Sequence, residues 1–390
     1  MARAGDLPVG VKQKIEILKA LARGAEILIL DEPTSVLTPQ ETDRLFQELK
    51  TLCELGHTIV FISHKIHEVK TISDRVTIMR GGRCVGVFDT DAISEQEIAN
   101  NIVGRDLGAV DRKPLCTQTP KTATEKSAVK IKVRDLMLAG RGDVPILGGV
   151  SFDVRGGEIL GVVGVQGNGQ AELAETLTRY RRPDAGSIFI NGSDASDISI
   201  KQLRDLGCGY IPEDRLDQGV AEQSEIRDNL ISNLYSKPPY CKRGVLRKKK
   251  VNEFANSLIA DYDIDCNSIA SSVSMLSGGN MQKLVAAREC SASTDVLIAE
   301  QPTRGVDIGA AEIIHKRILS LRSNGCAVLL ISADLSEVMR LSDCIIVLFE
   351  GKITAYFDDV PAVTEEELGL CMLGIEKHSH EQIGRAYCDK

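Results

Sequence analysis

An internal repeat constrains this chain more than any other feature of its sequence. Four separate blocks near its start recur near its end, always 269 residues later. The paired blocks are LPVGVKQ (7–13) with LSGGNMQ (276–282), DEPT (31–34) with EQPT (300–303), ISH (62–64) with ISA (331–333), and SD (73–74) with SD (342–343). Four blocks in a single register do not arise by chance, so the chain contains a duplicated domain.

The two copies differ in how much sequence precedes the shared blocks. In the second copy, 147 residues run from Val129 to the LSGGN segment, whereas six residues precede the matching Leu7 in the first copy. We therefore expect residues 1–107 to form the rear part of a first domain, and residues 129–375 to form a complete second domain. A linker rich in Pro, Thr and Lys would join them over residues 108–128, and residues 376–390 would form a tail.

Both copies predict an α/β fold. The runs EILIL (26–30) and TIVFI (58–62) are short, apolar and rich in β-branched residues, which is typical of buried parallel strands. A helical pattern from Pro39 to Leu55 lies between them, and the second copy repeats the strand pattern at 296–299 and 327–331. Strands that alternate with helices predict a doubly wound parallel sheet.

Composition excludes several classes of function. The chain has 47 basic and 55 acidic residues, so its net charge of −8 gives no global reason to bind nucleic acid. Trp is absent and aromatic residues make up 4%, which argues against stacking platforms for bases. Eleven scattered cysteines without a CxxC pair indicate reduced thiols in a cytosol. No apolar run is long enough to span a bilayer.

A glycine-rich loop follows an apolar strand pattern in the second copy. It reads GVQGNGQA (164–171), and Gly164 and Gly169 keep the spacing of the phosphate-loop pattern GxxxxGK[ST]. Gln170 stands where a lysine should reach the phosphates, and Ala171 stands where a hydroxyl should bind Mg²⁺. The loop can therefore offer backbone N–H groups, but neither a cation nor a metal ligand. The candidate nucleotide-binding residues here are Gly164, Gly167, Asn168, Gly169, Gln170 and Ala171.

An acidic pair ends the first apolar strand of the first copy. Asp31 is suited to binding Mg²⁺, Glu32 to polarising an attacking water, and His64, after the next strand, to contacting a γ-phosphate. The alternatives are a helix-capping acidic pair and a structural histidine. At the equivalent positions the second copy has Glu300, Gln301 and Ala333. Glutamine cannot accept a proton and alanine cannot contact a phosphate.

The losses in the two copies are complementary. The second copy retains LSGGN, and the first has LPVGV in its place; the first retains DEPT and ISH, and the second has lost both. One composite site therefore keeps its chemistry, while the other does not.

These motifs together resemble the ATP-binding subunits of ABC transporters. The resemblance rests on LSGGNMQ (276–282), DEPT (31–34), QPTRGVD (301–307) and ISH (62–64), and it covers the chain apart from the linker and the tail. The segments IPEDR (211–215), GNGQ (167–170) and QPTRG more narrowly resemble the tandem ATPases of sugar and nucleoside importers. The run from Val9 to Glu41 favours the purine-nucleoside branch.

The resemblance implies two α/β nucleotide-binding domains of the phosphate-loop type in tandem, the first of them incomplete. In this family each ATP lies between the phosphate loop of one domain and the LSGGQ-type segment of the other. The competent site would thus combine Asp31, Glu32 and His64 with Ser277, Gly278 and Gly279. The loop 164–171 would face the eroded LPVGV and bind nucleotide without hydrolysis. Glu213 stands where such domains usually carry a glutamine that faces the membrane partner.

The resemblance also implies cofactors, partners and a location. ATP and Mg²⁺ would be the cofactors, and transmembrane permease subunits the direct partners. An extracytoplasmic solute-binding protein would act indirectly, and no nucleic acid would bind. The protein would be peripheral, on the cytoplasmic face of the cell membrane, and would power import of nucleosides or sugars.

Two other functions stay open from the sequence. By the repeat offset, the phosphate loop of the first copy would lie before Met1, so we expect weak or no ATP turnover by this chain alone, which leaves a non-catalytic remnant as one alternative. A soluble tandem ABC protein acting on ribosomes is another, but it predicts two intact phosphate loops and a basic linker. A basic cluster at 242–250 favours a solvated face over contact with anionic lipid or a membrane partner.

Overall fold

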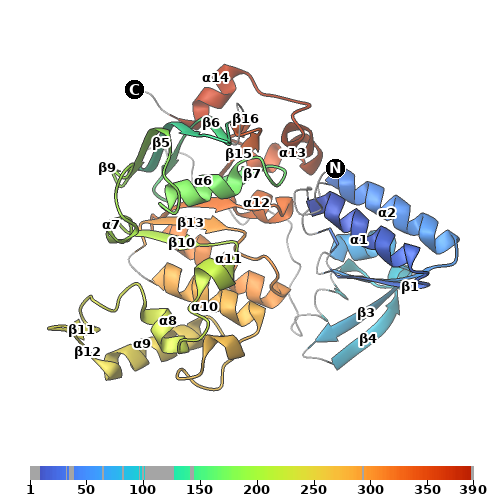
Figure 1. Cartoon of the computed structure of the whole chain (residues 1–390), viewed down its shortest axis with the longest axis horizontal. Coiled ribbons are helices and arrows are strands. Elements are labelled where there is room, and N and C mark those ends of the chain that lie inside the picture. The colour runs from blue at the N-terminus through green and yellow to red at the C-terminus, as the bar shows by residue number, and fades with distance from the viewer. Residues whose placement is uncertain are drawn as a thin grey trace. The chain divides into compact units, whose positions relative to one another are not determined.

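The computed structural model describes residues 9–31, 33–34, 39–63, 66–80, 83–95, 97–98, 101, 127–140, 145–291 and 294–387. The chain divides into two compact units, residues 1–112 (unit 1) and residues 113–390 (unit 2), which contain the elements labelled in Figure 1. Among the described residues, no helix has the length and apolar character needed to cross a bilayer. The division falls within the predicted linker, most of which lies outside the described residues.

Unit 1 pairs a short parallel sheet with a hairpin and three helices. Its elements are α1 (Val9–Ala22), β1 (Ile27–Asp31), α2 (Pro39–Glu54), β2 (Thr58–Ile62), α3 (Ile66–Ile72), β3 (Arg75–Arg80) and β4 (Arg83–Asp89). Strands β1 and β2 are parallel, with Ile27 opposite Thr58, and β3 and β4 are antiparallel. The amphipathic helix α2 buries Leu45, Phe46 and Leu49.

Unit 2 is built on a six-stranded sheet in the order β10-β13-β14-β7-β15-β16. Its first five strands are parallel, and β16 is antiparallel to β15. A four-stranded antiparallel sheet has the order β6-β5-β8-β9. The strands are β5 (Val129–Leu138), β6 (Leu147–Arg155), β7 (Ile159–Val163), β8 (Ala185–Ile190), β9 (Ser193–Asp194), β10 (Cys208–Ile211), β11 (Cys241–Lys242), β12 (Val245–Leu246), β13 (Val296–Glu300), β14 (Ala327–Ile331), β15 (Cys344–Phe349) and β16 (Lys352–Phe357).

Helices cover the six-stranded sheet of unit 2, and this sheet separates two apolar cores. The helices are α6 (Gln170–Leu177), α7 (Ile200–Asp205), α8 (Ile226–Ile231), α9 (Lys248–Asp261), α10 (Gly278–Ser291), α11 (Ile308–Ser323), α12 (Leu335–Leu341), α13 (Glu365–Met372) and α14 (His380–Ile383). Along β13, Val296 and Ile298 join a core with the four-stranded sheet and α6, whereas Leu297 and Ala299 join a core with α8 to α11. The fully buried strand β13 is therefore apolar on both faces, as expected for a central parallel strand.

The duplication inferred from the sequence is seen element by element. The helices and strands of unit 1 correspond, 269 residues later, to α10, β13, α11, β14, α12, β15 and β16 of unit 2. The pairing register is the same, because Ile27 lies opposite Thr58 and Val296 lies opposite Ala327. A side-chain hydrogen bond is also repeated: Thr34 donates to Glu68 in unit 1, and Thr303 donates to Glu337 in unit 2.

One central strand of unit 2 has no counterpart among the described residues of unit 1. Strand β7 lies between β14 and β15 and joins them into one sheet, whereas the β1-β2 pair and the β3-β4 pair are separate sheets. Without such a strand beside β1, Ile27, Leu28 and Ile29 are expected to be poorly covered. Ile27 and Ile29 are 62% and 69% exposed, but Leu28 is buried at 3%. Alternate residues of a strand face opposite sides, and on the side of Leu28 the helix α2 packs on the sheet through the contact of Phe46 with Phe61.

Candidate functional site

The glycine-rich loop of unit 2 has the backbone path of a phosphate loop. It connects β7 to α6, and Gly167 and Gly169 both have positive φ, at 92° and 102°. Gly169 is the N-cap of α6, so the first N–H groups of that helix point into the loop. A Cβ at Gly164 would lie 2.5 Å from the carbonyl oxygen of Leu348, so only glycine fits there. The loop can therefore present backbone N–H groups to an anion.

The side chains of the loop are used to hold the loop itself. The amide nitrogen of Gln170 donates to the carbonyl oxygen of Val165, at 3.2 Å, across the loop. The side-chain oxygen of Asn168 accepts from the N–H of Glu350, at 2.9 Å, at the turn between β15 and β16. Gln170 thus occupies the position of the phosphate-binding lysine with a neutral group that bonds to the loop, and Asn168 anchors the loop to the sheet.

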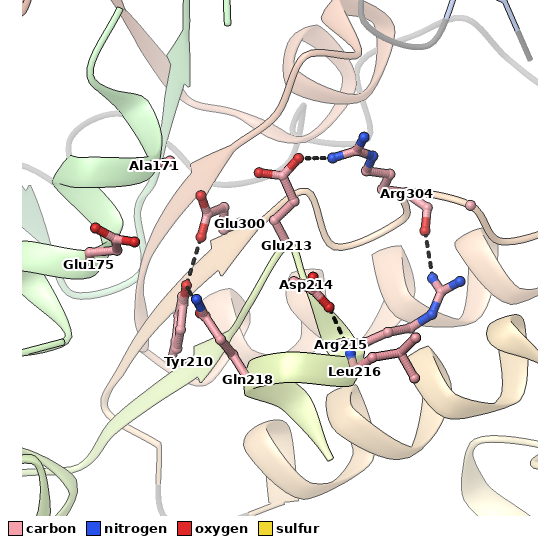
Figure 2. A pocket seen from close by; sticks show the side chains of 11 residues that line it. Ala171, Glu175, Tyr210, Glu213, Asp214, Arg215, Leu216, Gln218, Glu300 and Arg304 are labelled. Atoms are coloured by element: carbon pink, nitrogen blue, oxygen red, sulfur yellow. Dashed lines mark hydrogen bonds and ion pairs between the residues drawn. The ribbon is translucent and has the colours of Figure 1, made fainter. Parts of the chain in front are cut away.

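A cavity of about 520 Å³ opens beside the start of α6. Figure 2 shows its lining, which comes from α6, from β10 and the turn after it, and from the end of β13 and the loop that follows. The lining residues are Ala171, Glu175, Tyr210, Glu213, Asp214, Arg215, Leu216, Gln218, Glu300, Arg304 and Gly305. Ala171 and Glu300, which stand at the predicted metal-binding positions, therefore meet at one cavity.

Glu300 is bound to a tyrosine that the sequence analysis did not single out. The hydroxyl of Tyr210 donates to a carboxyl oxygen of Glu300 at 2.6 Å (Figure 2), and Glu300 is only 4% exposed. The pKa of Glu300 is raised to about 7, chiefly by burial and also by the charges of Glu175 and Glu172, against the lowering effect of the hydrogen bond from Tyr210. A carboxyl group that is half-protonated near neutral pH and satisfied by a phenol is a poor ligand for Mg²⁺.

We expect Glu300→Gln to make the stability of unit 2 less dependent on pH. Because the folded pKa of Glu300 lies above its ordinary value of 4.5, the stability that this group contributes is present below pH 4.5 and is lost as the pH rises through about 7. Glutamine keeps an oxygen for Tyr210 and never ionises. In urea unfolding the variant should gain about 2 kcal/mol over the parent at pH 8 and nothing at pH 4.5.

The exposed Glu376→Gln serves as the matched control for this prediction, because it removes the same charge outside the cavity. It should shift the unfolding midpoint equally at both pH values. A Glu300→Gln variant that is equally or less stable than the parent at pH 8 would show that Glu300 is ionised and well solvated in the folded protein.

The segments IPEDR and QPTRG, which carry part of the family resemblance, meet at this cavity. Glu213 forms an ion pair with the guanidinium of Arg304, and Arg215 donates to the carbonyl oxygen of Arg304 at 3.0 Å (Figure 2). Asp214 caps the helical turn Arg215–Gly219, because its carboxylate accepts hydrogen bonds from the N–H groups of Leu216 and Asp217. Glu213, which stands where the family resemblance predicts a membrane-facing glutamine, is thus paired with an arginine of the same unit.

Gln301 stands at the predicted position of the catalytic base in unit 2, and its side chain is hydrogen-bonded there. Its backbone has a φ of 45°, and its side-chain oxygen accepts from the N–H of Ala333 at 3.1 Å. Gln301 and Ala333 stand at the positions that correspond to Glu32 and His64, the predicted base and the predicted γ-phosphate contact. In unit 2 the two positions are therefore tied to each other by a hydrogen bond, with neither side chain able to accept a proton from water.

The LSGGN segment forms the start of the long helix α10. The hydroxyl of Ser277 accepts from the backbone N–H and the side-chain nitrogen of Asn280, at 3.4 and 3.0 Å, which places Ser277 at the helix N-terminus. Ser277 is exposed, and Gly278 and Gly279 are half-buried. A Cβ at Gly278 would lie 2.5 Å from the guanidinium of Arg215, so a larger residue would displace that arginine. The segment thus offers a hydroxyl and helix N–H groups at the surface.

The remaining candidate residues lie in unit 1. Asp31 ends β1, opposite Ile62 in β2, and its side chain is exposed. Glu32 and His64 lie outside the described residues. The cavity of unit 2 includes Ala171 but none of the three LSGGN residues Ser277, Gly278 and Gly279. The phosphate loop and the LSGGN segment of unit 2 therefore do not share this cavity.

The residues of unit 2 fit the phosphates of a nucleotide and do not fit a metal ion. The loop supplies backbone N–H groups, but Ala171 has no ligand atom and Glu300 is held by Tyr210. Within the part of the chain that the structure describes, no group of three or more His, Cys, Asp or Glu side chains could hold a metal. Any nucleotide bound by this loop would be held by backbone groups without Mg²⁺ from unit 2.

Comparison with known proteins identifies the family. Residues 147–304 match the ABC transporter family. The chain is 39% identical to the nucleoside import ATP-binding protein NupA of Lactococcus lactis subsp. cremoris, over 95% of this chain and 71% of that protein. It is 40% identical to the guanosine import ATP-binding protein NupO of Bacillus subtilis, over 99% of this chain and 73% of that protein. The chain belongs to the ABC transporter family of import ATP-binding proteins.

Solved structures agree with the fold. An ATP-binding subunit of an ABC transporter has a TM-score of 0.53 at 20% identity, over 63% of this chain and 99% of that one. A dimeric ATP-binding cassette bound to ADP and phosphate has a TM-score of 0.52 at 18% identity, over 58% of this chain and 97% of that one. The predicted α/β fold and the ABC family are therefore confirmed, while the individual roles of the site residues stay predictions.

Proposed function

We propose that this ABC protein binds and hydrolyses ATP to power the import of nucleosides, with hydrolysis at one of its two composite sites. The observation that carries the choice of solute is the 39–40% identity to nucleoside and guanosine import proteins over 95–99% of the chain. Relatives named for glucose import and for ribose import are 38% and 34–36% identical over similar lengths. A sugar is therefore the second choice.

The site chemistry supports the division between the two composite sites. Asp31 is an exposed carboxylate at the end of a parallel strand, where it can hold Mg²⁺, which neutralises charge on the phosphates. We propose Glu32 as the base that polarises water and His64 as the contact to the γ-phosphate. Ser277, Gly278 and Gly279 would complete this site from unit 2 through a hydroxyl and helix N–H groups.

The second composite site would bind ATP without hydrolysing it. Its phosphate loop keeps the backbone groups of Gly164, Gly167 and Gly169, but Gln170 is bonded to the loop and Gln301 to Ala333. Retention of such a site supports a role in holding the two domains together rather than in turnover. The direct partners would be permease subunits in the cell membrane, at whose cytoplasmic face this protein would sit.

Uptake measurements test the proposed solute. Deletion of the coding region in its host should abolish uptake of radiolabelled guanosine and leave ribose uptake within about threefold of the parent. Loss of ribose uptake with normal guanosine uptake would reverse the choice of solute. Normal uptake of both would favour a non-catalytic remnant.

We expect Gln301→Ala to change ATP turnover of the assembled importer by less than about threefold, because this site does not hydrolyse ATP. The variant loses the bond to Ala333 and should be less stable by about 1 kcal/mol. Gln301→Glu is the informative companion, since it supplies a carboxylate where a base belongs. It should not raise turnover, because Gln170 and Ala171 still lack the cation and the metal ligand. A large change in turnover from either variant would show that the second site is active.

A further inference from the structure

A small hairpin and the helix that follows it carry the densest positive charge of the chain. We call residues 241–250 the basic hairpin; they comprise β11, β12 and the first turn of α9, which lie at one extremity of unit 2 in Figure 1. The segment contains six cations and no acidic residue, in a chain whose net charge is −8. The six cations are Lys242, Arg243, Arg247, Lys248, Lys249 and Lys250.

The basic hairpin is held in one conformation. Arg243 and Gly244 both have positive φ, at 53° and 79°, which is the two-residue turn that matches the twist of a hairpin. The N–H of Arg247 donates to the carbonyl oxygen of Tyr240 at 2.8 Å, and the ring of Tyr240 packs against Phe254 of α9, with centroids 5.0 Å apart. The cations of the hairpin and of the helix are therefore fixed next to each other.

The stability of the fold does not account for these cations. Lys248, Lys249 and Lys250 occupy the first turn of α9, where the helix dipole disfavours positive charge, and that turn contains no acidic residue. Arg247 is the N-cap but makes no capping hydrogen bond through its side chain. Lys250 pairs with Glu253 at 2.8 Å, whereas the other five cations form no ion pair with any described residue. The lysines at the start of α9 therefore do not stabilise the helix, and what they add is positive charge on the surface.

Two apolar side chains are exposed among these cations. Val245 and Leu246 of β12 are 69% and 45% exposed, although each could have been polar at no cost to the core. In the hairpin register Val245 lies opposite Lys242 and Leu246 opposite Cys241, so each face of the hairpin carries an apolar side chain, and on the Val245 face it is paired with a cation. Exposed apolar side chains surrounded by several Lys and Arg fit the boundary between lipid headgroups and acyl chains.

We propose that the basic hairpin binds the surface of an anionic lipid bilayer. The cations would attract acidic headgroups, and Val245 and Leu246 would enter the boundary beneath them. This contact needs neither ATP nor a particular transported solute, so it stands or falls separately from the proposed function. It would orient unit 2 against the bilayer beside the permease.

Co-sedimentation of the full chain with lipid vesicles tests this proposal. In 0.1 M salt the chain should bind vesicles of phosphatidylcholine containing about a third phosphatidylglycerol, and it should not bind pure phosphatidylcholine. The triple variant Lys242→Gln, Lys248→Gln, Lys249→Gln should bind the anionic vesicles about 100-fold more weakly. Its substitutions are all on exposed side chains, and two of them remove positive charge from the start of α9, so its thermal unfolding midpoint should not fall below that of the parent.

A matched control removes the same charge elsewhere in unit 2. Lys201, Lys316 and Lys352 are also exposed, and replacing all three by glutamine should leave vesicle binding within about twofold of the parent. A second variant, Val245→Ser with Leu246→Ser, keeps every charge and should bind anionic vesicles about tenfold more weakly. It should bind heparin as the parent does, because heparin offers charge without an apolar phase.

Three results would overturn the proposal. The first is absence of binding to anionic vesicles by the parent chain. The second is an equal loss of binding in the basic-hairpin variant and in the matched control, which would reduce the effect to net charge. The third is a parent chain that binds RNA or heparin through the basic hairpin while the serine variant binds vesicles normally, which would make the surface a site for a soluble polyanion.

Discussion

In an assembled importer that includes the phosphate loop of the first copy, replacement of Glu32 by glutamine is expected to lower ATP hydrolysis by at least about 100-fold while leaving ATP binding intact. Glutamine has nearly the same shape as glutamate but cannot polarise water by accepting its proton, and general-base catalysis contributes about 10²- to 10⁴-fold to such reactions. The duplicated copy already contains this change, since Gln301 occupies the matching position. Phosphate release and equilibrium binding of labelled ATP would be measured on the same preparation.

Glu54→Gln is the matched control, because it makes the same chemical change at an exposed residue of α2 in the same unit. It should leave both quantities unchanged. If Glu32→Gln hydrolysed ATP within about threefold of the parent, the assignment of the catalytic base would be wrong. A parallel loss of ATP binding would instead assign Glu32 to binding rather than to catalysis.

Replacement of Glu289 by alanine is expected to destabilise unit 2 by about 4 kcal/mol. The side chain of Glu289 is fully buried and pairs with Arg204 and with Arg288. It also accepts hydrogen bonds from the N–H of Tyr210 and the amide of Asn233, both at 3.2 Å. Removal of the carboxylate would leave two guanidinium groups without their counter-charge in a largely buried place, which is the costly way to break such a network.

The pKa of Glu289 indicates how well this charge is compensated. Burial by itself raises that pKa, but the guanidinium groups of Arg288 and Arg204 outweigh burial and hold it below its ordinary value. Glu289 also connects α10, which begins with the LSGGN segment, to α7 and β10. Loss of the network would therefore loosen the helix that presents Ser277.

Urea unfolding at pH 7 would measure the destabilisation caused by Glu289→Ala, with Glu366→Gln on the exposed face of α13 as the control. The control should stay within about 0.5 kcal/mol of the parent. Loss of less than about 1 kcal/mol in Glu289→Ala would mean that water reaches the two arginines and that the network is not a buried one.

Much of the fold of both units was accessible from the repeat. The offset of 269 residues places each labelled helix and strand of unit 1 on a partner in unit 2, and the apolar runs predicted β1, β2, β13 and β14 to within one residue. The spatial order of strands was not accessible, because β7 enters between β14 and β15 from a distant part of the chain. The burial of a strand residue also depends on which face of the sheet it occupies, so Leu28 is buried although its neighbours Ile27 and Ile29 are exposed.

The candidate site was predicted in outline rather than in its contacts. Residue types alone showed that Gln170 cannot supply the charge of a lysine and that Ala171 cannot supply a hydroxyl, because these properties belong to the side chains themselves. The partners of Glu300 and Glu213 could not be found in this way, since Tyr210 and Arg304 lie 90 and 91 residues from them in the sequence. The presence of both IPEDR and QPTRG in the sequence was the available indication of these contacts, because the two segments lie against each other at the cavity.

The central claim is that the phosphate loop of unit 2 holds ATP without hydrolysing it, and the purified chain tests this directly. Incubation with ATP labelled in the γ-phosphate and Mg²⁺, followed by rapid filtration, separates bound nucleotide from released phosphate. We expect the label to remain bound as intact ATP and Gln170→Ala to change only the amount bound. Release of phosphate that persists in Glu32→Gln and disappears in Gln301→Ala would contradict this expectation.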